Sequence, residues 1–82
     1  MILTAVYFAE MNQSYDFRLE ESAPVGQLVE DMVSMIAQKE RIPLSRRPGM
    51  FLLCSRKDAR IFDPATSLAQ NGVRSGDEIM LI

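Results

Sequence analysis

Hydrophobic and polar positions alternate most clearly from Tyr15 to Glu20, where apolar side chains take every second place and charged ones the places between. A period of two predicts a β-strand with one face toward a core and one toward water. Residues 2–8 are a continuous apolar and β-branched run, which predicts a second strand. The polar segment 10–14 between these runs, with Asn12 in its middle, predicts the turn of a β-hairpin.

After Pro24 the period changes to the three- and four-residue steps of an amphipathic helix. The apolar residues at these steps form one stripe along the helix, and they are Val25, Leu28, Val29, Met32, Val33 and Ile36. Pro24 suits the first helical position because its missing N–H would be unpaired there in any case. Pro43 forbids the helix beyond about Glu40, since it cannot continue the hydrogen-bond ladder.

The second half of the chain has shorter apolar runs separated by polar segments. Residues 50–54 and 78–82 predict two further strands, and residues 61–62 predict a very short one. A single helical turn over residues 69–71 should end at Gly72, which adopts a left-handed conformation without penalty.

A lone amphipathic helix must bury its stripe, and the only surface available is the sheet. If the first and last strands are central and parallel, a right-handed crossover carries the helix across one face. The sequence therefore predicts an α+β fold of the β-grasp type, a mixed sheet of four to five strands packed on one α-helix. Residues 1–82 are expected to form a single domain.

Composition excludes several kinds of chemistry. Nine Lys and Arg against eleven Asp and Glu give a net charge of −2, so we expect no basic face for nucleic acid. No His and one Cys exclude a Ser-His-Asp triad, an internal disulfide and a Cys-based zinc site. Cys54 is interpreted as a small hydrophobe. We predict a protein that is not an enzyme and has no catalytic residue, cofactor or metal.

Charged pairs along the chain are interpreted as solvated surface. Neighbouring residues such as Glu20-Glu21 and Glu30-Asp31 point in different directions and do not converge on a ligand. Arg46-Arg47 is too small a patch to indicate a partner.

No apolar run approaches the roughly 20 residues of a membrane span, so we expect no direct membrane insertion. The N-terminal residues lack a positive segment and a cleavage signal, and one unpaired Cys fits a reducing compartment. The predicted location is the cytoplasm.

The predicted sheet has large apolar residues on both faces, and the helix can cover only one of them. The register that we predict sends inward Leu3, Ala5, Tyr7, Phe51, Leu53, Ile79 and Leu81, and leaves on the open face Val6, Phe8, Leu52, Met80 and Ile82. Exposed apolar patches usually mark binding surfaces, although central strands also tolerate apolar residues on both faces. The predicted protein-binding residues are Phe8, Leu52, Met80 and Ile82, with Arg18 at the rim for orientation.

The last third of the chain resembles ubiquitin-like domains in the order of its short elements. Residues 61–63 correspond to a short strand, residues 67–69 to a single turn anchored by a Leu, and residues 72–81 to a turn followed by the final apolar strand. Within these domains the chain is similar to the small bacterial YukD/EsaB family in Tyr15-Asp16-Phe17-Arg18-Leu19 and in Ala23-Pro24-Val25.

The family resemblance implies a cytosolic accessory of a type VII (ESX-like) secretion system that acts by protein–protein interaction. Its partner would be a protein. Two partners are left open, a membrane-associated component of that system and a second copy of the chain. A further similarity, over residues 61–73, to the small subunit of multicomponent aromatic monooxygenases leaves open the role of a non-catalytic enzyme subunit. The sequence ends at Ile82 without the Gly-Gly tail of conjugated modifiers, so we expect no conjugation.

Overall fold

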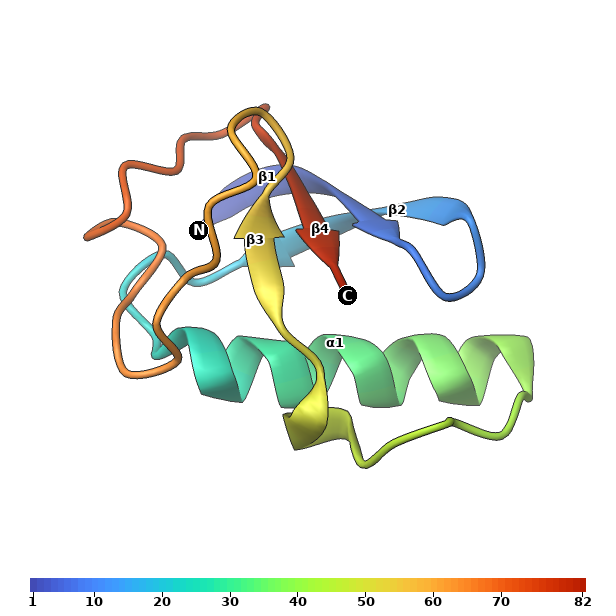
Figure 1. The fold of residues 1–82 in the computed structure, drawn as a ribbon. Helices are drawn as coiled ribbons and strands as arrows, with labels where there is room; N and C mark the ends of the chain where they lie inside the picture. The colour runs from blue at the N-terminus through green and yellow to red at the C-terminus, as the bar shows by residue number, and fades with distance from the viewer.

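A computed structural model describes residues 1–82 and places one helix along one face of a four-stranded sheet (Figure 1). The elements are β1 (Ile2–Phe8), β2 (Gln13–Leu19), α1 (Val25–Glu40), a 3₁₀ turn (Pro48–Met50), β3 (Leu53–Ser55) and β4 (Glu78–Leu81). The strand order is β2-β1-β4-β3, with β1 parallel to β4 and the other pairs antiparallel. The predicted mixed sheet on one helix is confirmed.

The hairpin of β1 and β2 pairs along its whole length, from Ile2 opposite Leu19 to Phe8 opposite Gln13. Asn12 in the turn has a φ of 52°, in the left-handed region that Asn tolerates better than most residues. The turn predicted around Asn12 is therefore confirmed.

Helix α1 buries all six residues of the predicted stripe against the sheet. It ends at Glu40 as predicted, and Arg41 turns the chain through a left-handed conformation at φ 55°. The helix begins one residue later than predicted, at Val25. Pro24 lies in extended backbone immediately before it instead of at the first helical position.

The second half of the chain is less regular than predicted. The strand expected over residues 50–54 is reduced to β3, because Pro48 starts a 3₁₀ turn that includes Met50. Residues 61–62 form only an isolated bridge, in which Ile61 pairs with Cys54. The single turn is present, and Gly72 ends it at φ 74°.

The core lies between α1 and the inner face of the sheet, and the predicted register of β1 is wrong. Val6 and Phe8 point inward and are completely buried, whereas Leu3 and Tyr7 point outward. Residues 2–8 are apolar at nearly every position, so either register suits a core. Pairing with β2 decides, since Val6 lies opposite the inward-facing Tyr15 and opposite residues share a face.

The registers of the other strands are as predicted. Tyr15, Phe17 and Leu19 of β2 pack toward the core, and Asp16 and Arg18 are exposed. The inward residues of the last two strands and the segment before β3 are Phe51, Leu53, Ile79 and Leu81.

Candidate protein-interaction surface

The open face is the sheet surface opposite α1, and a row of apolar side chains crosses it. Tyr7 of β1 pairs with Met80 of β4, Met80 pairs with Cys54 of β3, and Cys54 pairs with Ile61. Because paired residues on neighbouring strands share a face, these four side chains lie side by side. Two more residues adjoin this row, and together they form the apolar band: Tyr7, Leu52, Cys54, Ile61, Met80 and Ile82.

Leu52 and Ile82 continue the ladder beyond β3 and β4. Each donates its backbone N–H to the carbonyl of the other at 2.9 Å. Leu52 is 39% exposed and Ile61 is 55% exposed, so the band presents large apolar groups to solvent, as binding surfaces commonly do.

Cys54 lies at the bottom of the band and is only 2% exposed. Its Sγ donates to the Met80 carbonyl at 3.6 Å, and burial raises the pKa of the thiol. The neutral thiol is the form that burial favours, which agrees with the interpretation of Cys54 as a small hydrophobe.

A cation lies over the margin of the band. The Arg56 guanidinium carbon is 4.3 Å from the centre of the Tyr7 ring, and Arg56 Nη1 is 3.5 Å from Glu78 Oε1. The Tyr7 hydroxyl donates to Asn12 Oδ1 at 2.5 Å. Tyr7 is thereby held at its ring and at its hydroxyl, and Arg56 supplies a charged rim beside an apolar centre.

The β2 part of the open face is polar and carries Ser14, Asp16 and Arg18. Arg18 pairs with Leu3, an exposed residue of β1. The open face is therefore divided into the apolar band over β1, β4 and β3 and a charged strip along β2.

Most of the predicted site residues lie on the open face. Leu52, Met80 and Ile82 belong to the band, and Arg18 lies on the charged strip. Phe8 does not, since it is 0% exposed and its ring packs against Phe51 with centroids 5.4 Å apart. Its orientation was predicted wrongly because the pattern of β1 alone cannot distinguish two apolar faces.

Sequence reasoning missed Tyr7 and Ile61 as members of the band. Tyr7 was predicted to point inward because the predicted register of β1 exchanged its two faces. Ile61 precedes Phe62, which is 1% exposed, and alternation from that core residue would have sent Ile61 outward.

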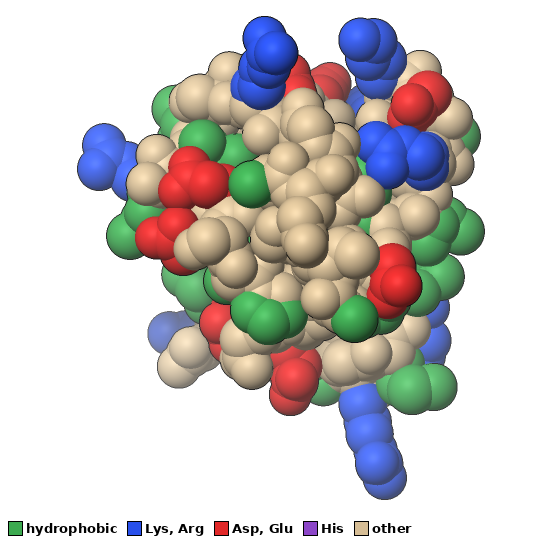
Figure 2. Space-filling model, turned by 90° about the vertical axis from the view of Figure 1, so that its left-hand side faces the viewer, with side chains coloured by type: hydrophobic (Ala, Val, Ile, Leu, Met, Phe, Trp, Pro, Cys, Tyr) green, Lys and Arg blue, Asp and Glu red, His purple; other side chains and the backbone are tan.

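No three His, Cys, Asp or Glu side chains lie close enough to hold a metal ion. The end of the molecule with the loops of residues 56–76 shows acidic and basic side chains interspersed, with hydrophobic atoms only in small separate patches (Figure 2). Helix α1 lacks the length and apolar character of a membrane span.

Residues 3–81 match a family model described as WXG100 protein secretion system (Wss), protein YukD. The chain belongs to the YukD family. The resemblance inferred from the sequence is thereby confirmed. No match was found among curated proteins.

Solved structures share the fold of this YukD-family chain at low sequence identity. The EccD5 ubiquitin-like domain from Mycobacterium xenopi is 21% identical with a TM-score of 0.79, covering 99% of this chain and 91% of that domain. Caldiarchaeum subterraneum ubiquitin is 18% identical with a TM-score of 0.68, covering 99% and 90%. A chain of the MycP5-free ESX-5 inner membrane complex is 19% identical with a TM-score of 0.81, but this chain covers only 20% of it. These likenesses show a ubiquitin-like β-grasp fold.

Proposed function

We propose that residues 1–82 form one non-catalytic ubiquitin-like docking module, a cytosolic accessory component of a type VII secretion system. The observation that carries this proposal is the apolar band on the sheet face opposite α1, in which Leu52 and Ile61 are 39% and 55% exposed although both are apolar. Membership of the YukD family supports the choice of secretion system.

The partner is a component of the membrane-associated secretion apparatus. A ubiquitin-like domain of EccD5 and a chain of the ESX-5 inner membrane complex both share this fold, which supports such a setting. The fold alone does not specify function, so the assignment depends on the band and the family together.

Docking would place the band at the centre of the interface and the arginines at its rim. Burial of Leu52, Met80 and Ile82 would supply the favourable free energy, because apolar surface removed from water contributes roughly 25 cal/mol per Å². Arg56 and Arg18 would orient the partner, since rim charges influence association and register more than affinity.

The test is recovery of secretion-system components from the native host with a tagged full chain. Leu52→Asp combined with Met80→Asp should abolish that recovery, because two carboxylates would be buried without partners. Leu52→Asp alone, at the more exposed of the two positions, should reduce it strongly.

Met50→Asp is the matched control, since Met50 is exposed in the 3₁₀ turn and lies outside the band. It should leave recovery unchanged, and circular dichroism should show all variants folded. Unchanged recovery with the folded double variant would contradict the proposal.

A further inference from the structure

The two edges of the sheet differ in how far their backbone groups are paired. At the β3 edge, Phe62 donates its N–H to the Leu53 carbonyl at 2.9 Å, and Ser55 donates to the Arg60 carbonyl at 2.8 Å. At the opposite edge, β2 is seven residues long and pairs only with β1. A long unpaired edge is a template for a further strand.

The hydrogen bonds of β1 show which backbone N–H and C=O groups of β2 have no partner in the sheet. Ala5 donates its N–H to Asp77, and the Leu3 carbonyl accepts from Gly76, so odd-numbered residues of β1 bond toward β4. The even-numbered residues of β1 therefore bond β2, and in the observed register their partners are the odd-numbered residues of β2. The N–H and C=O groups of Ser14, Asp16 and Arg18 point outward from the sheet.

The sequence of β2 complements itself when it pairs antiparallel with a second copy. With a two-fold axis at Phe17, Asp16 of each copy lies opposite Arg18 of the other. These are the residues whose backbone groups point outward, so they would form hydrogen-bonded pairs. Moving the axis by one residue puts Asp16 opposite Asp16 or Arg18 opposite Arg18, and directly opposite like charges are destabilising. Charge thus favours the register centred on Phe17 over its two immediate neighbours.

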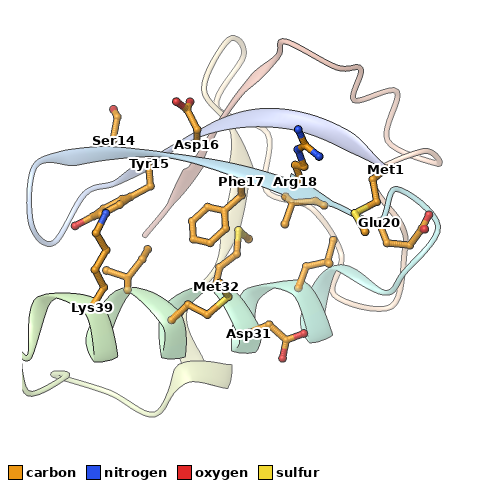
Figure 3. A pocket seen from close by; sticks show the side chains of 14 residues that line it. Met1, Ser14, Tyr15, Asp16, Phe17, Arg18, Glu20, Asp31, Met32 and Lys39 are labelled. Carbon is orange, nitrogen blue, oxygen red and sulfur yellow. The ribbon is translucent and has the colours of Figure 1, made fainter.

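The space beneath this edge is an apolar groove of about 860 Å³ between β2 and α1. Figure 3 shows Tyr15 and Phe17 pointing toward the helix, while Ser14, Asp16 and Arg18 point to the other side of the sheet. Met35 lines the groove and is 56% exposed although it is apolar. A second copy at the edge would cover this groove.

The exposed ridge of α1 along the groove has the same two-fold complementarity. Asp31, Met35 and Lys39 follow one another at four-residue steps on one side of the helix. The rotation that pairs β2 with its copy runs the two helices antiparallel. The Asp31 end of one ridge then faces the Lys39 end of the other, with Met35 between them.

We propose that the chain forms a symmetric dimer through β2, with four strands from each copy in one continuous sheet. This inference concerns the β2 edge and not the apolar band, shares only Arg18 with the proposed docking surface, and does not depend on the proposed function. In the dimer both open faces point the same way, so two apolar bands lie on one surface, separated by the charged strips of the two β2 strands. A partner with two matching sites would then bind with higher avidity than a single band provides.

The test is sedimentation equilibrium of the full chain and of two charge variants over a wide range of concentrations. Asp16→Arg and Arg18→Asp each replace both interchain ion pairs with like-charge pairs, so each should weaken self-association by at least about tenfold. An equimolar mixture of the two variants should recover the dimer, because the two arginines on the strand of one variant then face the two aspartates on the strand of the other. Arg47→Asp, the same change of charge in the exposed loop before the 3₁₀ turn, should leave dimerisation unchanged.

Circular dichroism of each variant alone verifies the fold, and recovery on mixing would itself show that both variants are folded. A wild-type chain that stays monomeric at every concentration would overturn the proposal. So would a mixture that fails to associate, or a β2 edge that binds an extended segment of another protein and not a second copy.

Discussion

The two faces of the sheet are built from similar residues and differ in what covers them. On the inner face, Val6, Phe8 and Leu81 are completely buried under the stripe of α1. On the open face, Leu3 and Leu52 remain exposed, and the Arg56 guanidinium lies over the Tyr7 ring. Apolar composition alone therefore does not identify the core. Side chains on the inner face hold the fold together, whereas Leu3 and Leu52 on the open face remain accessible to solvent.

The largest effect that separates the two faces should come from Phe8→Ala. Removing a fully buried ring that packs on Phe51 leaves a cavity, and we expect a loss of about 3–5 kcal/mol in the free energy of unfolding. Leu3→Ala on the open face of the same strand should cost less than about 1 kcal/mol. Urea unfolding of both variants measures the difference, and equal losses would contradict the assigned register of β1.

A smaller effect is expected from Arg56→Gln, which removes the cation over Tyr7 and the ion pair with Glu78. The stability should fall by about 0.5–1 kcal/mol, since cation–π contacts at exposed sites contribute little more than this. Lys57→Gln, in the same loop, is the control and should have no measurable effect. A loss of several kcal/mol for Arg56→Gln would show that the open face contributes to the core.

The smallest effect should be seen at high pH and concerns Tyr15, at the β2 side of the inner face. Burial, together with the hydrogen bond that the hydroxyl donates to Glu40 Oε1 at 3.2 Å, raises the pKa of Tyr15 above its usual value near 10. The folded state then holds this proton more tightly than the unfolded state, so stability falls as pH rises above about 10. Tyr15→Phe should remove this contribution to the loss of folding stability at alkaline pH. Thermal unfolding between neutral and alkaline pH measures it, and identical profiles would contradict the role of Tyr15.

The sequence predicted the orientation of an element correctly where a single periodicity dominated the pattern of that element. The stripe of α1 and the alternation of β2 each have a polar side, so the side that faces the core follows from the pattern alone. It failed at β1, where Tyr7 and Phe8 are both large and apolar. It also overestimated the strand at residues 50–54, because the Pro48 turn competes with extended backbone.

The candidate surface was predicted in part for the same reason. Leu52, Met80 and Ile82 were assigned to the open face because their neighbours are core residues in regular alternation. Phe8 was predicted in place of Tyr7. Ile61 was missed although it precedes the core residue Phe62, and its place beside Cys54 depends on a bridge that the short polar segment between them closes.

The sequence by itself determined the order of the elements, the buried stripe of the helix and the polar side of β2, because these follow from local periodicity. Only the tertiary structure decided which face of β1 is core, which residues form the apolar band, and which edge of the sheet stays unpaired. These features depend on how strands pair, locally between β1 and β2 and over long range between β4 and its two neighbours, and a strand that is apolar on both faces takes its orientation from its neighbours.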